Sequence, residues 1–415
     1  MIRAKPPGRV RRPQLESGWP HVCIPDRAYS LHVRAKSFEG LRGVAAFVVV
    51  IHHLLRSVPA LEFVYSDAPA VSKGSAAWWL GFTPLHGIWA GEEAILLFLL
   101  SSSLLLARSW TVSIAESWPQ FYVRVIRLFL LVWAALGFAL VTIAIVPRGI
   151  ISVPTPWVSQ HPARMSRHDL IGDVVFVVRS GVGSNSVLWF IRWLVLFSLS
   201  FPVWMYVALL LRRFHLQQIA LGALGIVVFL AGEHQSAVIM AVLGLGVMAA
   251  INWDDLSRRL AATRLFKGKR AAVASVLTIA LGTWRWTRHG LGVSASGRLM
   301  IGVDNLAVVA AAVLAMCLTI TSNEWSTVLS NRVVLYVGSR ALSLVLVHDP
   351  IIVAYAYLSH GRPNVLALFA VVLPFVLIVT ELFYQLVELP VEQLAGWVAK
   401  MIPNRRPPLP ESVRF

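Results

Sequence analysis

Ten long apolar runs, separated by short polar or turn-rich segments, constrain the fold more than any other feature of the sequence. A helix needs about 20 apolar residues to cross a bilayer, and most of the runs approach this length. Only 14% of the residues are charged, whereas about 25% is usual in a soluble domain. We therefore predict an all-α polytopic membrane protein with about ten transmembrane helices, the fifth and seventh being short. The predicted spans are residues 41–58, 88–107, 125–146, 187–211, 216–231, 235–251, 271–284, 302–321, 334–357 and 365–388.

The basic residues are distributed unevenly between the two sides that these spans define. Of the 37 Lys and Arg residues, 24 lie in or at the edge of the segments that are cytoplasmic if the N-terminus is cytoplasmic, and nine lie on the other side. Cytoplasmic loops of membrane proteins carry the excess of Lys and Arg, which predicts an N-in/C-in topology. The net charge of +17 is thus a topological signal, and we predict no nucleic-acid partner.

The remaining segments define the domain organisation. Residues 1–36 are basic and contain prolines but no signal-peptide core, which predicts a disordered cytoplasmic tail. Residues 37–393 form the predicted transmembrane domain, and 394–415 form a cytoplasmic C-terminal tail. The largest outer loop, 147–186, contains four prolines and should lack long helices. With two cysteines and no zinc-like spacing, we predict neither a disulfide framework nor a metal site.

An arginine and a histidine share one face of the first predicted span. In SFEGLRGVAAFVVVIHHLL, Arg42 and His53 are eleven residues apart, so in an α-helix they lie about 20° apart around the axis and about 16 Å apart along it. This places Arg42 at the cytoplasmic end and His53 well into the bilayer, whereas His52 points about 80° away from Arg42. Because an arginine facing lipid is costly, we expect this face to line a polar cavity. The alternative is that Arg42 only anchors the helix and His53 only bridges helices.

Other polar residues lie at the ends or inside further predicted spans. Arg124 and Arg127, at positions i and i+3, point the same way at the cytoplasmic start of the third span, and guanidinium groups bind phosphate bidentately. The other polar residues are Glu93 in the second span, Trp189 and Arg192 in the fourth, His348 in the ninth and Glu388 in the tenth. Each of these residues, and the arginine pair as well, also has an ordinary interpretation as a topological signal, an interfacial anchor or a hydrogen-bonded intramembrane group.

The order of these motifs resembles that of the membrane-bound acyltransferase family 3. SFEGLRGVAAFVVVIHH is similar to the first family signature, in which a histidine follows the arginine by eleven residues, and this match selects His53. QFYVRVIRLF resembles the R-x-x-R element, and VLWFIRWLVLFSLSFP resembles the middle motif. YVGSRALSLVLVHDPII resembles the late motif that contains His348, and VELP resembles the terminal E-x-P with Glu388. The matches extend in family order from about residue 37 to 393.

Two departures from the family pattern affect the expected site. LFLLSSS in the second span lacks the glycine of the usual F-F-V-L-S-G, so helix packing there is expected to differ. Leu194 stands where many members have a glutamate after Trp189. If an acidic catalytic group is needed it must come from elsewhere, and Glu93 is the candidate.

The resemblance implies acyl transfer, commonly of an acetyl group, from acyl-CoA to a hydroxyl of a sugar, a lipid-linked glycan or a secondary metabolite. Because acyl-CoA is a cytosolic polyanion, Arg124 and Arg127 would bind its phosphates, with Arg42 beneath them. Imidazole, with an ordinary pKa near 6.5, can accept a hydroxyl proton at neutral pH, so His53 is the candidate general base. Direct attack by the acceptor and a transient acyl-histidine are both open. Further candidates for the cavity wall are Trp189, Arg192, His348 and Glu388.

Two other functions remain compatible with the sequence. Buried arginine and histidine also mark the pathways of transporters for anionic solutes, although no interrupted helix pair or inverted repeat is evident. The chain could also be an inactive scaffold of a surface-polymer complex, given the altered serine-glycine and glutamate positions. The composition, rich in Arg, Ala, Val and Trp, favours a multi-pass protein of a bacterial plasma membrane.

Overall fold

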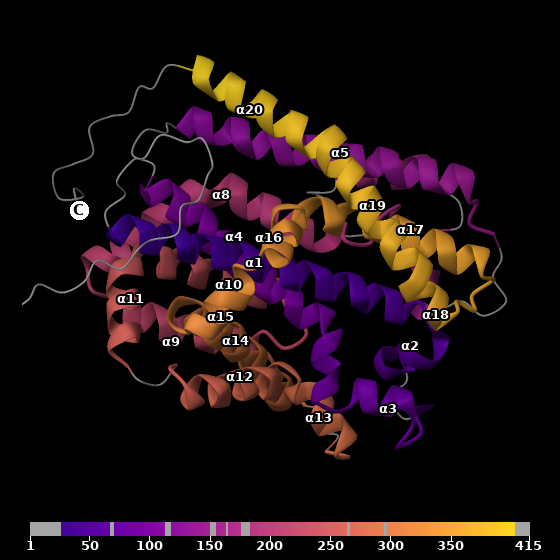
Figure 1. Cartoon of the computed structure of the whole chain (residues 1–415), viewed down its shortest axis with the longest axis horizontal. Helices are drawn as coiled ribbons and strands as arrows, with labels where there is room; N and C mark the ends of the chain where they lie inside the picture. The colour runs from indigo at the N-terminus through magenta and orange to yellow at the C-terminus, as the bar shows by residue number, and fades with distance from the viewer. Residues whose placement is uncertain are drawn as a thin grey trace, which may run out of the picture.

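The computed structural model describes residues 26–66, 70–112, 118–149, 155–162, 165–175, 183–263, 266–293 and 297–402, and these ranges contain helices and loops but no β-strand. The all-α prediction is therefore confirmed (Figure 1). The helices are α1 Asp26–Arg56, α2 Pro59–Ser66, α3 Ala76–Gly81, η2 Pro84–Ile88, α4 Gly91–Val112, α5 Trp118–Ile145, α6 Pro156–Ser159, α7 Arg167–Val174, α8 Leu188–Arg213, α9 Gln217–Leu230, α10 Gln235–Ile251, α11 Trp253–Ala262, α12 Lys269–Gly282, α13 Trp284–Gly290, α14 Arg298–Thr321, α15 Asn323–Leu329, α16 Arg332–Ser339, α17 Ala341–Leu358, α18 Val365–Ala367, η3 Leu368–Val372, α19 Leu373–Phe383, η4 Tyr384–Glu388 and α20 Leu389–Met401.

All ten predicted spans are helical, but fewer than ten helices are long enough to cross a bilayer. Within the described ranges seven helices are long and apolar enough, or eight if α10 and α11, which are bent by 83° at their junction, form one span. The fifth, sixth and seventh predicted spans became helices of only 14, 17 and 14 residues. The prediction of a polytopic membrane protein holds, whereas length and composition support seven or eight spans instead of ten. The N-in/C-in orientation remains a prediction.

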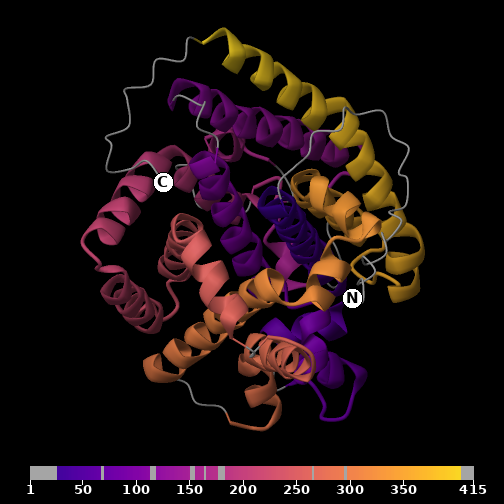
Figure 2. The ribbon, with the colours of Figure 1, turned by 60° about the vertical axis from the view of Figure 1, so that its left-hand side comes forward.

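Helix α1 lies in the middle of the helix bundle (Figure 2) and packs against α4, α16 and α17. In the most apolar part of α1, 72% of the residues are buried inside the protein. The contact with α16 depends on two glycines, because a Cβ on Gly43 would lie 2.5 Å from the backbone nitrogen of Gly338. Small residues allow such close helix packing where lipid provides no hydrophobic driving force between helices.

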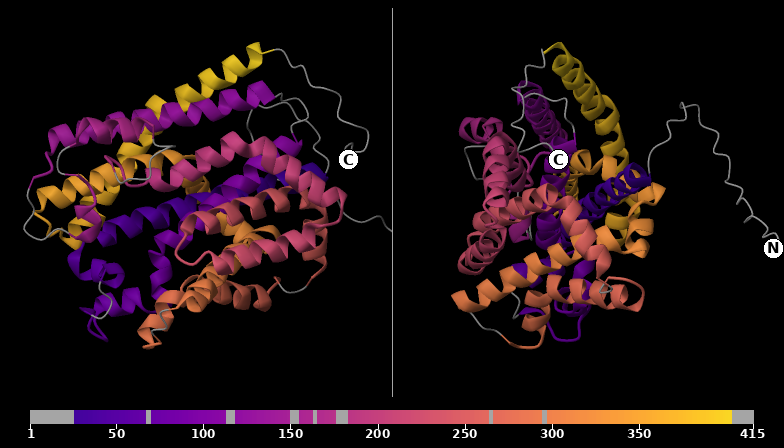
Figure 3. Two further views of the ribbon diagram at one scale, coloured as in Figure 1. Left: turned by 180° about the vertical axis from the view of Figure 1, so that it is seen from behind. Right: turned by 90° about the vertical axis from the view of Figure 1, so that its left-hand side faces the viewer.

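The long helices α5 and α20 run side by side along one edge of the molecule (Figures 1 and 3). In the most apolar part of α5 only 28% of the residues are buried inside the protein, and in that of the continuous segment Val365–Met401 only 22% are. Their exposed residues are largely aliphatic or aromatic, among them Ile126, Val141 and Leu386. An exposed apolar face of this extent fits contact with lipid chains.

The segment boundaries differ from the predicted ones at both ends of the membrane domain. Helix α1 begins at Asp26, inside the predicted N-terminal tail, and α20 continues to Met401, inside the predicted C-terminal tail. The rest of both tails lies outside the described residues. In the loop 147–186, the described parts contain only the four-residue α6 and the eight-residue α7, as its prolines predict.

Candidate active site

His53 lies in the last turn of α1 and is hydrogen-bonded to His348 of α17. Nδ1 of His53 is 2.7 Å from Nε2 of His348, and Nδ1 of His348 is 2.9 Å from the carbonyl oxygen of Leu344. Because a carbonyl oxygen only accepts, a neutral His348 carries its proton on Nδ1 and accepts on Nε2. A neutral His53 therefore donates through Nδ1, and its Nε2 keeps the lone pair that a general base requires.

The plane of the His53 ring is fixed by two neighbouring rings. Trp157 of α6 stacks on it, with ring centroids 5.0 Å apart and planes inclined by 11°. The ring of His348 is nearly coplanar with that of His53, inclined by 15°, and the two rings meet edge to edge through the 2.7 Å hydrogen bond. Among the residues that the structure describes, none hydrogen-bonds to Nε2 of His53. The ring is thus oriented while one nitrogen remains unpaired.

A proline in α17 explains how the segment before α8 is attached beside His348. Pro350 has no backbone N–H, so the carbonyl of Leu346, four residues earlier, cannot form its helical hydrogen bond. The side-chain amide of Asn185 donates to this carbonyl at 2.8 Å. Asn185 lies just before α8, so the proline that interrupts α17 also creates the docking point for the start of α8.

A buried acid–base pair stands behind His348. Asp349 accepts hydrogen bonds from the backbone nitrogen of Ser186 at 3.0 Å and from the Ser186 hydroxyl, and its Oδ2 is 3.3 Å from Nε2 of His161. Nδ1 of His161 faces the carbonyl oxygen of Trp157 at 3.1 Å. His161 must donate there, so it shares one further proton with Asp349 through Nε2. His53, His348, Asp349 and His161 are buried together, and we call them the histidine cluster.

An ion pair between α1 and α2 holds Trp157 over the histidine cluster. Arg56 binds both carboxylate oxygens of Glu62, at 2.7 and 2.8 Å, in the bidentate geometry typical of arginine. Glu62 also accepts a hydrogen bond from the backbone nitrogen of Trp157 at 3.2 Å. The carboxylate of Glu62 is buried, and it positions the first turn of α6 so that the Trp157 ring reaches His53.

His52 faces the other side of α1 and belongs to a different set of contacts. Its Nδ1 donates to the carbonyl oxygen of Trp89 at 3.0 Å and lies 3.2 Å from the Tyr65 hydroxyl, which is 3.2 Å from Nε2 of His86. A Cβ on Gly91 would lie 2.3 Å from the His52 ring, so only glycine fits there. Burial and the nearby Glu93 and Glu92 raise the pKa of Tyr65 well above its usual value, so its hydroxyl keeps its proton. These contacts make His52 a packing residue.

Arg42 and Arg127 gather with two glutamates toward the opposite end of α1. Arg42 donates to the carbonyl oxygen of Gly338 at 3.3 Å, and the charges that act on it are those of Glu39, Glu388, Arg127 and Glu392. Arg127 forms an ion pair with Glu392 at 2.6 Å, and Glu388 accepts from the Ser343 hydroxyl. We call the group of Arg42, Arg127, Glu388 and Glu392 the basic end because it holds the two described arginines that the sequence predicts for the donor, and Glu39 adds a third carboxylate beside Arg42. Arg124 belongs to α5, but its side chain lies outside what the structure describes.

The remaining predicted site residues are divided among other places. Glu93 and Trp189 line one cavity with residues of α10, α13 and α14, and the Trp286 indole donates to Glu93 at 2.8 Å. No hydrogen bond or ion pair joins Glu93 to His53 in the ranges that the structure covers. Arg192 packs beside the ring of Trp193, 5.3 Å from its centroid, and does not line this cavity. The single cavity expected from the sequence is thus divided into the histidine cluster, the Glu93 cavity and the basic end.

His53 lies near the end of its helix. Helix α1 ends at Arg56, and the His53 ring is covered by Trp157 of α6, while its depth in the bilayer stays a prediction. Arg42 contacts Gly338 of α16 and His53 contacts His348 of α17, the next helix along the chain, as expected for two residues on one face of α1. His52 faces away from these helices, in agreement with the same geometry.

Several residues of the site were not singled out from the sequence. Trp157 and His161 lie in an outer loop, where spacing alone gives no indication of a site. Asp304 lies just inside the predicted span 302–321. Because an intramembrane carboxylate is by default a functional candidate, the position of Asp304 in the sequence could have identified it. In the described part of the chain, no group of three or more His, Cys, Asp and Glu side chains could hold a metal ion.

Comparison with known proteins identifies one family. A family model described as an acyltransferase domain matches residues 36–384, from the start of the apolar part of α1 to the beginning of η4. The matched region contains the whole histidine cluster, whereas Glu388 lies just beyond it. No curated protein and no solved structure matches this chain.

Proposed function

This chain belongs to the membrane-bound acyltransferase family 3, whose domain model matches most of its length, and we propose that it transfers an acyl group from acyl-CoA to a hydroxyl. The acyl group is commonly acetyl in this family, and the proposed acceptor is a carbohydrate, a glycolipid or a secondary metabolite. The protein is thus a multi-pass membrane enzyme of acyl transfer, for which we propose a bacterial plasma membrane as the location.

The hydrogen bond between His53 and His348 is the observation that supports this proposal best. It directs the proton of a neutral His53 to Nδ1 and leaves Nε2 unpaired, as a general base requires. Trp157 and Glu62 hold the ring in place, which is the preorganisation that a catalytic base needs. His348 can spread the positive charge that forms when His53 takes a proton, and Asp349 and His161 stand directly behind it.

The chemistry balances with these residues and the two substrates. Nε2 of His53 accepts the hydroxyl proton while the acceptor oxygen attacks the thioester carbonyl. The carbon–oxygen bond forms, the carbon–sulfur bond breaks, and the proton on His53 passes to the departing CoA sulfur. Glu93 has no contact with His53 in the structure, so we assign it no proton transfer in this scheme and keep it as a candidate for binding.

The basic end is our proposed site for the CoA phosphates. Arg42 lies about 16 Å from His53 along α1, judged from the helical rise, a distance that the pantetheine arm would have to span. Arg127 is paired with Glu392 at 2.6 Å, so a phosphate would have to replace that carboxylate. The side chains of Arg127 and Glu392 are 34% and 52% exposed, and exposed ion pairs contribute only about 0–1 kcal/mol, so the pair is a weak obstacle to this exchange.

The proposed function is tested by incubating the purified full-length protein with radiolabelled acetyl-CoA and cell-envelope extract. We expect label to enter an extractable acceptor together with release of free CoA thiol. Movement of an anionic solute into proteoliposomes without acyl-CoA, in the absence of label transfer, would instead indicate a transporter. If neither label transfer nor solute transport occurs, the result supports an inactive scaffold.

The donor site has a separate test. Substituting Arg127→Ala should raise the KM for acyl-CoA about five- to tenfold with little change in kcat, because a partly exposed arginine contributes roughly 1 kcal/mol to anion binding. The matched control is Arg258→Ala, which removes an exposed arginine that is paired with Asp255 on α11. An unchanged KM in the Arg127 variant would remove this residue from the donor site.

A further inference from the structure

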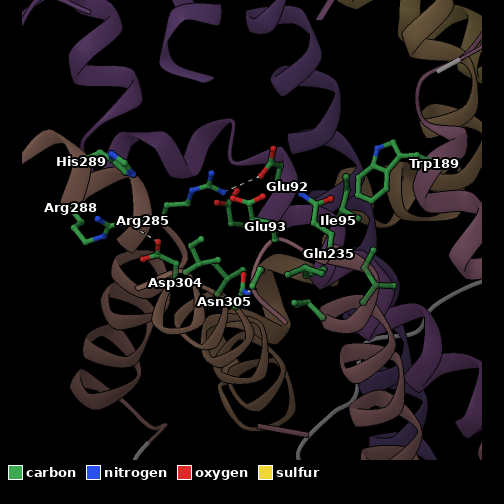
Figure 4. A pocket seen from close by; sticks show the side chains of 17 residues that line it. Glu92, Glu93, Ile95, Trp189, Gln235, Arg285, Arg288, His289, Asp304 and Asn305 are labelled. Carbon is green, nitrogen blue, oxygen red and sulfur yellow. Dashed lines mark hydrogen bonds and ion pairs between the residues drawn. The ribbon is translucent and has the colours of Figure 1, made fainter. Parts of the chain in front are cut away.

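A cavity of about 460 Å³ lies between α4, α10, α13 and α14, beside the start of α8 (Figure 4). Its volume falls in the range of about 300–1,000 Å³ that is usual for small-molecule sites. We propose that this cavity, which we call the acceptor cavity, binds a polyhydroxylated acceptor without negative charge. This inference rests on the proposed function, since it names the acceptor side of the same reaction. The polar residues of the wall are Glu92, Glu93, Trp189, Glu233, Gln235, Arg285, Arg288, His289, Asp304 and Asn305.

Three buried polar atoms of the wall have no hydrogen-bond partner. They are Oε2 of Glu93, Nε of Arg288 and Oδ1 of Asp304. The other groups of the same side chains are paired, since Arg288 contacts Asp304 at 2.8 Å and Glu93 accepts from Trp286. Arg288 and Asp304 are 4% and 6% exposed, so bulk solvent does not satisfy these atoms. Buried polar groups in native proteins are nearly always paired, so three unpaired atoms in side chains that line one cavity mark a wall with incomplete hydrogen bonds. Rotation of these side chains would turn the unpaired atoms toward a ligand that supplies the missing partners.

The wall combines these groups in a way that suits a polyol. Carboxylate oxygens accept hydrogen bonds from hydroxyl groups, and guanidinium and amide N–H groups donate to them. Trp189 contributes an aromatic ring, and Ile95, Ile239 and Ile301 add apolar surface against which C–H faces can pack. A molecule with many hydroxyls and apolar ring faces uses both kinds of surface.

The charges of the acceptor cavity disfavour an anion. Four carboxylates face two guanidinium groups, and Glu92 and Asp304 are paired with Arg285 and Arg288 at 3.7 and 2.8 Å. Burial and the neighbouring Arg288 and Arg285 lower the pKa of His289, so it is neutral at pH 7 and adds no positive charge. Of the two remaining acidic groups, the exposed Glu233 is not matched by a cation in the wall, and Glu93 is half-buried beside Glu92 without a basic partner in this wall. A neutral or amino-bearing acceptor fits this balance, and a uronic acid does not.

Two chains of contacts connect the acceptor cavity with the histidine cluster. Trp189, in the cavity wall, follows Ser186 by one helical turn, and Ser186 binds Asp349. On the other side the ring of Trp286, which donates to Glu93, lies 4.6 Å from the ring of Tyr65, whose hydroxyl contacts His52. The ring centroid of His52 lies 5.3 Å from that of His53, which completes the second chain. The cavity therefore lies at the same end of α1 as His53 and opposite the basic end, so donor phosphates and acceptor would approach the base from different sides.

Binding of three sugars to the detergent-solubilised full-length protein tests this inference without acyl-CoA. The probes are methyl glucoside, glucosamine and glucuronate, which are neutral, cationic and anionic forms of one ring, and ligand-observed NMR measures their binding. We expect methyl glucoside and glucosamine to bind and glucuronate to bind at least tenfold more weakly. Preferred binding of glucuronate, or no binding of any probe, would overturn the inference.

Variants locate the bound sugar. Trp189→Leu should weaken glucosamine binding about fivefold, as expected for the loss of one aromatic contact, and Glu233→Gln, at an exposed position that tolerates substitution, should weaken it about threefold. The matched controls are Trp397→Leu and Asp255→Asn, on exposed faces of α20 and α11, which should bind as the wild type does. Equal binding in all four variants would place the sugar elsewhere and refute the acceptor cavity.

The outcomes separate this inference from the proposed function. If the sugars bind in the cavity but no acyl group is transferred from acetyl-CoA, the function fails and the binding site stands. If label is transferred to a sugar whose KM is the same in the Trp189 variant and the wild type, the function stands and the acceptor cavity fails.

Discussion

The histidine cluster and the acceptor cavity are both buried and polar, but they differ in how completely their hydrogen bonds are formed. In the histidine cluster, both nitrogens of His348 and His161 and both oxygens of Asp349 have partners, and only Nε2 of His53 has none. In the acceptor cavity, Glu93, Arg288 and Asp304 each keep one buried atom unpaired. One region thus fixes a single reactive atom, and the other presents several open groups.

This difference follows from what each region would have to do. A fully hydrogen-bonded network is rigid and can hold a base within the narrow limits that catalysis requires. A partly satisfied network is costly until a ligand completes it, and that cost favours ligands with matching groups. Substitutions in the histidine cluster should therefore change the rate of the chemical step, and substitutions in the acceptor cavity should change affinity.

The largest expected effect is on the base itself. His53→Gln should lower kcat by about 10²- to 10⁴-fold, the usual contribution of general acid–base catalysis, and leave sugar binding unchanged. The control is His52→Gln at the neighbouring position, which should lower stability through its lost contact with Trp89 but keep kcat within a few-fold. Transfer rates and ligand-observed NMR give the two readouts. Equal loss of kcat in both variants would contradict the helical-face argument.

The second largest effect on kcat is expected from Asp349, the carboxylate of the histidine cluster that follows His348 in α17. Asp349→Asn should lower kcat about tenfold and reduce stability by about 3 kcal/mol, because His161 would lose its buried carboxylate partner. The pH–rate profile should shift as well, which a purely structural role would not produce. Asp173→Asn is the matched control, since Asp173 is also buried and accepts from the backbone and hydroxyl of Ser184. It should cost stability without moving the pH profile.

A smaller effect, on the free energy of unfolding, is expected from His86, which lies between the histidine cluster and the acceptor cavity. Its ring contacts the Tyr65 hydroxyl and stacks on Trp286 with centroids 4.5 Å apart. Burial lowers the pKa of His86 to about 3, so the folded protein keeps it neutral. An unfolded histidine binds a proton below about pH 6.5, so stability present above that pH is lost as the pH falls toward 3.

The measurement is the free energy of unfolding at pH 7.5 and pH 5. The wild type should lose about 2 kcal/mol more over this interval than His86→Gln, in which no proton can be taken up, since one pKa unit corresponds to about 1.4 kcal/mol. Other titrating groups are common to both proteins and cancel in the difference. Identical losses in the two proteins would mean that His86 is not held neutral, and that the aromatic contact between the two regions is looser than the structure indicates.

The sequence by itself determined the apolar helices and the shared face of Arg42 and His53. These properties follow from local periodicity, because a helix fixes the relative direction of residues along its own axis. It also placed His348 in the site through the family motif. The number of spans was less predictable, since the short runs that form α9, α10 and α12 have the composition of spans but not the length.

Only the tertiary structure decided what surrounds these residues. The stacking of Trp157 on His53, the pairing of His161 with Asp349 and the hydrogen bond from Trp286 to Glu93 join segments more than 90 residues apart. Such contacts depend on how helices cross and where loops fold back, and neither is encoded in the periodicity of a single segment. The sequence could therefore propose His53 as the base, but only the packing of the helices shows which groups contact its ring and where the wall of the proposed acceptor cavity lies.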